Sequence, residues 1–192
     1  MDKYDTYVEA PHIIASSARP GPLVFLAGGI TGCPDWQHEA RIELERDDGT
    51  GKPLHPCTIL NPRRADFPMA DPMAAAEQIA WEYDALRDAD IVLFWFCKET
   101  VQPIVLFELG ATMERHYYED DEDESDTPLE KRWGGDKCVI GVEEGYARVQ
   151  DVQLQVALRR GPWQVIHRTL EAVLNEVKAR IWGYHDAFGR PE

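Results

Sequence analysis

One glutamate stands in an otherwise apolar stretch of the chain. Glu108 lies within Ile104–Ala111, where every other residue is Ile, Val, Leu, Phe, Gly or Ala. Burying a carboxylate among such side chains is unfavourable unless the group finds a partner or keeps a proton. Glu108 is therefore either a group that does chemistry in a dry pocket or a structural carboxylate that pairs with Arg63 or Arg64.

Two adjacent arginines could meet a negatively charged group. Arg63 and Arg64 follow Asn61 and a proline. A guanidinium binds a phosphate, a substrate carboxylate or a catalytic glutamate through parallel hydrogen bonds. In the other interpretation, both arginines lie at the surface and pair with Asp66 or Asp71. The residue types leave both interpretations open.

Two glycines end the apolar run Leu23–Ala27, and a tryptophan follows them. Gly28 and Gly29 would let a ligand approach the backbone closely, although a plain tight turn also explains them. Trp36 could stack on a nucleobase, but core packing is the role that we favour. The segment lacks the spacing of a dinucleotide fingerprint, and the chain contains no GxxxxGK[S/T] phosphate-binding motif.

Short apolar runs alternate with amphipathic stretches along the chain. We expect buried strands at residues 23–27, 57–60, 91–96 and 138–142. We expect helices at residues 35–45, 73–88, 103–118 and 163–182, and either an edge strand or a short helix at 149–156. This alternation predicts a single α/β domain with an open, mostly parallel sheet that is covered by helices on both faces.

The predicted domain spans residues 23–185 and follows an N-terminal arm, residues 1–22, whose order depends on docking. In open parallel sheets, ligands bind beyond the carboxyl ends of the strands. That rule points to the loops at residues 28–31, 61–64, 98–103 and 143–148.

The helix expected at 73–88 carries a second acidic candidate. Its period places Ile79, Tyr83 and Leu86 on the apolar face. Glu82 then lies at the edge of that face, whereas Asp84 lies outside it. Glu82 is therefore the carboxylate of this helix that we expect near a pocket.

The composition argues against several classes of protein. Lys and Arg number 20 and Asp and Glu number 35 among 192 residues, a net charge of −15 that would repel the phosphates of a nucleic acid. Seven of the acidic residues lie within 119–126, so we expect a solvated acidic loop at 119–130. The apolar runs are too short to span a membrane, which argues against a membrane protein.

The cysteines lack the paired spacing of a zinc site or a disulfide framework. They are Cys33, Cys57, Cys97 and Cys138. We expect them to be small buried hydrophobic residues in a cytoplasmic protein that has no secretory leader. We expect neither a metal nor another cofactor.

A series of short motifs occurs in a fixed order from about Leu23 to Gln153. They are Phe25–Ile30 with Asp35–Gln37, Asn61–Arg64, Trp81-Glu82 with Leu86, Ala89-Asp90, Phe94–Phe96, Glu99-Thr100, and Pro103-Ile104 with Phe107–Gly110. Together these motifs resemble the nucleoside 2-deoxyribosyltransferase-like family. The resemblance implies a flavodoxin-like three-layer sandwich, a nucleoside or nucleotide as a small-molecule partner, and a homo-oligomer.

The resemblance also implies roles for individual residues. Glu108 of the E-L-G motif attacks the anomeric carbon of a 2-deoxyribosyl group, and Glu82 helps to orient the sugar or the nucleophile. Where the transferases carry an aspartate before the nucleophile, this chain has Gln102, which leaves Glu99 or water to protonate the leaving base. Where a neighbouring subunit donates an asparagine, this chain has Asp151.

We therefore expect cleavage or exchange of the N-glycosidic bond of a 2′-deoxynucleoside or deoxynucleotide. The residues that we expect to contact the substrate are Gly28, Gly29, Ile30, Trp36, Asn61, Arg63, Arg64, Thr100, Gln102, Arg148 and Asp151. Two other functions remain open. One is a nucleotide-binding sensor that keeps the pocket without turnover, and the other is a structural protein whose acidic loop binds a basic partner.

Overall fold

The computed structural model describes residues 6–12, 19–51, 53–68, 70–118 and 136–189. The acidic loop predicted at 119–130 lies outside these described residues. Within them, none of the helices combines the length and the apolar character that crossing a membrane requires.

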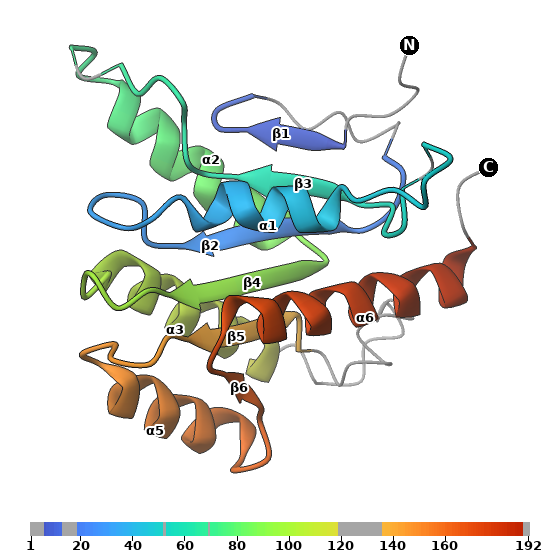
Figure 1. The fold of residues 1–192 in the computed structure, drawn as a ribbon. Helices are drawn as coiled ribbons and strands as arrows, with labels where there is room; N and C mark the ends of the chain where they lie inside the picture. Colours follow the sequence, from blue (N-terminus) through green and yellow to red (C-terminus); the bar gives the residue numbers. More distant parts are fainter. Residues whose placement is uncertain (1–5, 13–18, 52, 69, 119–135, 190–192) are drawn as a thin grey trace.

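Parallel strands form one six-stranded sheet in the order β1-β3-β2-β4-β5-β6 (Figure 1). The strands are β1 Tyr7–Glu9, β2 Leu23–Gly28, β3 Thr58–Asn61, β4 Ile91–Phe96, β5 Cys138–Val142 and β6 Ile166–His167. Every neighbouring pair of strands is parallel. The predicted open, parallel α/β sandwich is confirmed.

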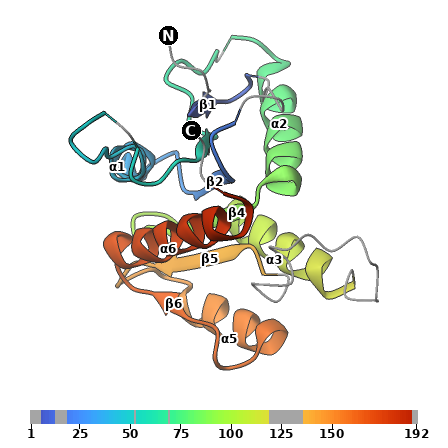
Figure 2. The ribbon, with the colours of Figure 1, turned by 90° about the vertical axis from the view of Figure 1, so that its right-hand side faces the viewer.

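Helices cover both faces of the sheet, as Figure 2 shows. They are α1 Trp36–Leu44, α2 Ala74–Asp88, α3 Pro103–Tyr118, α5 Val149–Arg160 and α6 Leu170–Phe188. Helices α1 and α6 pack on one face, and α2, α3 and α5 pack on the other. The central strands are apolar along their whole length because successive side chains point into two different cores.

Strand β4 shows how the two cores are built. Val92 and Phe94 belong to the core beneath α2 and α3. Leu93 and Trp95 belong to the core beneath α1 and α6. A strand covered on both faces needs apolar residues at every position, and this is why the run at 91–96 predicted a central strand correctly.

Helix α2 buries a different face from the one that the periodicity predicted. Ile79 is 65% exposed and Tyr83 is 55% exposed, whereas Leu86 is buried as predicted. Ala74 and Ala85 are buried instead. The prediction was wrong because a helix rich in alanine carries apolar residues on more than one face, and the sequence does not show which face meets the sheet.

The C-terminal part also differs from the prediction. Residues 149–156, which could have been a strand or a helix, belong to α5. The last helix begins at Leu170 instead of residue 163, because the side chain of Thr169 accepts a hydrogen bond from the amide of Ala172 at 3.2 Å and caps the helix there. Before this cap, Ile166 pairs with Ile140 of β5 as part of β6.

The segment predicted as an N-terminal arm contains a strand that the sequence did not reveal. Strand β1 pairs with β3, with Tyr7 opposite Ile59 and Glu9 opposite Asn61. Pairing satisfies the backbone groups along the free edge of β3. A strand of three residues is too short to produce a recognisable period.

Candidate active site

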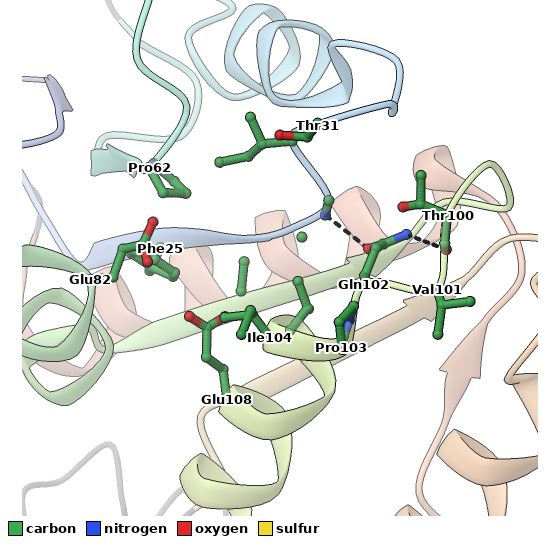
Figure 3. A pocket seen from close by; sticks show the side chains of 15 residues that line it. Phe25, Thr31, Pro62, Glu82, Thr100, Val101, Gln102, Pro103, Ile104 and Glu108 are labelled. Atoms are coloured by element: carbon green, nitrogen blue, oxygen red, sulfur yellow. Dashed lines mark hydrogen bonds between the residues drawn. The ribbon is translucent and has the colours of Figure 1, made fainter. Parts of the chain in front are cut away.

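A pocket of about 350 Å³ opens between the carboxyl ends of β2 and β4 (Figure 3). Its volume lies in the range of small-molecule sites. The chain leaves β2 toward β3 on one side of the sheet and later reaches β4 on the other side. The pocket therefore lies where the strand order reverses, which is the usual ligand position in such sheets.

Residues from β2, the loop after β3, α2, and the loop and helix after β4 line the pocket. They are Phe25, Ala27, Gly28, Gly29, Ile30, Thr31, Pro62, Glu82, Thr100, Val101, Gln102, Pro103, Ile104, Val105 and Glu108. Apart from the two glutamates, no residue in this lining carries a formal charge. The lining is mainly apolar, which strengthens electrostatic interactions inside the pocket.

The two glutamates come from different helices and share this apolar surrounding. Glu82 belongs to α2 and Glu108 belongs to α3, and Figure 3 shows both at the end of the pocket opposite Gln102. Burial and the nearby charge of Glu82 raise the pKa of Glu108 to about 8. Burial also raises the pKa of Glu82, while a hydrogen bond from Gln78 partly offsets this effect. The site therefore favours one proton and one negative charge on the pair near neutral pH.

Arg63 is engaged by the loop that joins β2 to α1. Its Nη2 donates hydrogen bonds to the carbonyls of Pro34 at 2.8 Å and Ile30 at 3.2 Å. Its Nε donates to Oε1 of Gln37 at 2.9 Å and lies 3.3 Å from a carboxylate oxygen of Asp35. The ion pair with Glu108 that the sequence left open is not formed, because this guanidinium holds the loop.

Arg64, in the loop after β3, contacts helix α2 instead. It lies 3.7 Å from a carboxylate oxygen of Glu77, and its guanidinium stands 5.4 Å from the centre of the Phe67 ring. The sequence had suggested Asp66 or Asp71 as its surface partner, so that suggestion was wrong about the residue. Like Arg63, Arg64 is absent from the lining of the pocket.

Close packing requires glycine at positions 28 and 29, where β2 ends. A Cβ atom on Gly28 would lie 2.4 Å from the Trp36 ring and 2.6 Å from the carbonyl oxygen of Trp95. Trp36 is only 2% exposed, and its indole nitrogen donates a hydrogen bond to the carbonyl of Gly29 at 3.1 Å. The core role that we favoured for Trp36 is confirmed, and both glycines line the pocket.

Gln102 fastens the two loops that form the pocket's rim. Its Oε1 accepts a hydrogen bond from the amide of Gly29 at 2.9 Å, and its Nε2 donates to the carbonyls of Cys97 at 2.7 Å and Thr100 at 3.4 Å. The residue is buried and has a φ of 53°, an uncommon conformation for a residue other than glycine. Because both ends of the carboxamide are engaged and the group carries no acidic proton, Gln102 acts here as a clamp.

Several predicted site residues lie elsewhere. Asn61 is buried and donates from Nδ2 to the hydroxyl of Tyr7 at 2.9 Å. Arg148 and Asp151 form an exposed ion pair at 3.6 Å near the start of α5. Glu99 is exposed and does not line the pocket, so it is not placed to protonate a leaving base there.

The pocket thus brings together about half of the residues predicted to act. Those that line it are Gly28, Gly29, Ile30, Glu82, Thr100, Gln102 and Glu108. Those outside its lining are Trp36, Asn61, Arg63, Arg64, Glu99, Arg148 and Asp151. In the described ranges, no group of three His, Cys, Asp or Glu side chains is arranged to hold a metal ion.

Sequence reasoning missed two kinds of residue at the site. Phe25 and Val105 line the pocket, but their apolar side chains are indistinguishable in the sequence from other core residues. Gln78 was also missed, although the sequence contained a signal for it. Gln78 lies one helical turn before Glu82, and residues four apart on a helix are neighbours.

The match to known proteins covers the segment that builds the pocket. The family model described as "Nucleoside 2-deoxyribosyltransferase like" matches residues 21–118, just over half of the 192 residues. This segment includes every element that contributes to the pocket's lining, from β2 to α3. A search of curated proteins gave no match. The architecture, the pocket and the matching segment agree, and the chain belongs to the nucleoside 2-deoxyribosyltransferase-like family.

Proposed function

We propose that the protein is an enzyme that cleaves or exchanges the N-glycosidic bond of a 2′-deoxynucleoside, with Glu108 as the nucleophile. Family membership supports an enzyme that takes a small-molecule nucleoside substrate. The observation that carries the proposal is a pair of carboxyl groups in an apolar pocket of about 350 Å³ at the reversal of strand order. Enzymes that cleave glycosidic bonds commonly use such a pair of carboxyl groups beside the bond that breaks.

The reaction follows from the charges of the two groups. As the bond between the anomeric carbon and the base breaks, positive charge develops on the sugar, and the carboxylate of Glu82 stabilises it. Ionised Glu108 then forms an ester with the anomeric carbon, and the base leaves with the electron pair of the broken bond. Water resolves the ester to free deoxyribose, whereas an acceptor base resolves it to a new nucleoside.

Glu108 must lose its proton before it can attack. Its pKa of about 8 means that the attacking carboxylate is the minor form in the empty pocket at neutral pH. A carboxylate with a raised pKa is also a stronger nucleophile once it is ionised. Water is the remaining proton source for the leaving base, because Gln102 has no acidic proton and Glu99 lies outside the pocket's lining.

The pocket favours a nucleoside over its 5′-monophosphate. Its lining contains two glutamates and no lysine, arginine or histidine. A phosphate would meet two acidic groups there, and the nearby guanidinium of Arg63 is engaged by the loop carbonyls. The expected specificity is therefore for the uncharged substrate.

A second function is a nucleotide-binding sensor without turnover. The observation that favours it is Gln102, a clamping carboxamide at the position where the family resemblance places an acid. A sensor would keep the pocket and bind the same ligand, but it would release no base.

Product analysis separates these functions. The purified chain is incubated with deoxynucleosides and with their monophosphates, with and without a free acceptor base, and the products are separated by chromatography. Free base alone indicates a hydrolase, and a new nucleoside indicates a transferase. Ligand-induced thermal stabilisation without any product would contradict the enzymatic proposal and favour the sensor.

A further inference from the structure

Gln78 links the carboxyl pair to the backbone of a neighbouring loop. Its side-chain nitrogen, Nε2, donates one hydrogen bond to the carbonyl oxygen of Pro62 at 2.7 Å and another to Oε1 of Glu82 at 2.8 Å. Pro62 and Glu82 both line the pocket, whereas Gln78 stands behind them. Gln78 therefore acts on the site only through its neighbours.

The carbonyl of Pro62 fixes the orientation of the Gln78 amide. A backbone carbonyl accepts hydrogen bonds and cannot donate them, so the nitrogen end of the amide has to face it. A flipped amide would bring its own oxygen against the carbonyl oxygen and would lose both bonds. With the nitrogen held in place, its second hydrogen points at Glu82, which has to act as an acceptor.

This arrangement persists although it leaves one polar atom unsatisfied. Within the described part of the chain, Oε1 of Gln78 is buried and has no hydrogen-bond partner. An unpaired buried acceptor is unfavourable. The two hydrogen bonds made by the nitrogen outweigh this cost, which underlines how firmly the amide is oriented toward Pro62 and Glu82.

We propose that Gln78 is a positioning residue that keeps the negative charge of the carboxyl pair on Glu82 and leaves the proton on Glu108. A hydrogen bond to a carboxylate is stronger than one to a neutral carboxyl oxygen, so a fixed donor selects the ionised form of Glu82. The meaning of this selection for turnover rests on the function proposed above, whereas the charge distribution itself does not.

The surrounding charges agree with this assignment. Glu108 on α3 is the other ionisable group in the lining of the pocket, and its pKa is raised by burial and by the charge of Glu82. On α2, Glu77 pairs with Arg64. Arg63, from the loop after β3, is engaged by the β2–α1 loop, and β2 contributes only apolar and glycine residues to the lining. Among the described residues, Gln78 is thus the polar contact that distinguishes Glu82 from Glu108.

The charge distribution can be measured on the free protein by carbon-13 NMR of the glutamate carboxyl groups during a pH titration. In the wild type, we expect Glu82 to account for most of the lower titration step and Glu108 for the upper one. Gln78→Leu removes both donors, so the lower step should move up by about one pH unit and divide between Glu82 and Glu108. An unchanged titration in this variant would overturn the proposal.

Two further variants make the test specific. Gln78→Lys keeps donors near both acceptors, so the Glu82 step should stay at or below its wild-type position, and a clear rise would also overturn the proposal. Gln153→Leu makes the same kind of change at an exposed position of α5 and should leave the titration of both carboxyl groups unaltered. If Gln78→Leu does not fold, the lysine variant still decides the matter.

Activity measurements then separate this inference from the proposed function. Where deoxynucleosides are cleaved, Gln78→Leu should change the pH dependence of kcat while KM changes little, because Gln78 does not line the pocket. A titration that shifts as expected in a protein that releases no base would support the role of Gln78 and contradict the enzymatic function. Cleavage of deoxynucleosides by a protein whose titration does not shift in Gln78→Leu would support the enzymatic function and contradict the role of Gln78.

Discussion

The loop held by Arg63 and the pocket that carries Glu108 lie at the same edge of the sheet, but they pair their charges differently. Arg63 meets a carboxylate, a side-chain amide and backbone carbonyls, so its guanidinium is surrounded by acceptors. Among the residues that the structure describes, the charge that acts on Glu108 in its apolar pocket is a like charge, that of Glu82. The structure surrounds the arginine with acceptors, whereas it opposes the charged form of the glutamate.

This difference separates a structural charge from a reactive one. A fully paired group is held in one position and one charge state, which suits the support of a loop. A carboxyl group with a raised pKa gains stability when a positive charge develops beside it, which suits stabilisation of a transition state. Arg63 therefore holds the loop beside the pocket, whereas the carboxyl pair is the part to which the proposed function assigns the chemistry.

The largest expected effect tests the reactive side of this comparison. Glu108→Gln keeps the volume of the side chain and removes the nucleophile, so kcat should fall by about 10³-fold or more. Binding of the deoxynucleoside, measured by thermal stabilisation, should persist. Glu114→Gln on the same helix is the control, because Glu114 is an exposed partner of Arg159 and should keep normal turnover. Near-normal activity of the Glu108 variant would rule out its role as nucleophile.

The next effect tests the structural side. Arg63→Met preserves much of the side-chain length but leaves the loop acceptors unpaired, so the free energy of unfolding in urea should fall by about 2 to 4 kcal/mol. Arg87→Met removes an arginine that pairs with Asp84 and Asp88 at the exposed surface, and should lower the free energy of unfolding far less, because water screens exposed ion pairs. Equal losses in the two variants would contradict a special role for Arg63. A preferential loss of nucleotide binding in Arg63→Met would instead identify Arg63 as a phosphate ligand.

The last effect concerns the dependence of stability on pH. The folded protein holds the Glu108 proton up to a pKa of about 8, whereas the ordinary value is 4.5. Between these values the folded state binds more protons than the unfolded state, so this group lowers stability as the pH rises. Glu108→Gln lacks that loss of stability, so the difference in unfolding free energy between this variant and the wild type should grow in favour of the variant between pH 4 and pH 9, by up to about 5 kcal/mol. A difference that stays constant with pH would show that the pKa of Glu108 is not raised.

Several parts of this molecule could be predicted from the sequence because they depend on local residue types. The runs at 23–27 and 91–96 are apolar at every position, which only a strand covered on both faces requires. Glu108 was conspicuous because its neighbours are apolar. Glu82 was also selected correctly, although the helical face on which that selection relied is largely exposed.

Other features depended on contacts between distant segments, and there the sequence was ambiguous or misleading. Arg63 looked like a partner for Glu108 or a phosphate, since a guanidinium binds any strong acceptor. Its actual partners are mainly carbonyl groups, which every residue possesses and which leave no signature in a sequence. The buried face of α2 was equally hidden, because alanines occur around much of the helix.

The sequence by itself determined the alternation of strands and helices from β2 to β5, the apolar setting of Glu108 and the family to which the chain belongs. Only the tertiary structure decided that Glu82 and Glu108 share one pocket while Arg63 and Arg64 lie outside its lining. It also decided that Gln78 is locked between Pro62 and Glu82. The reason is that residue types fix what each group can bind, whereas the chain's path through space fixes which of many chemically equivalent partners comes within reach.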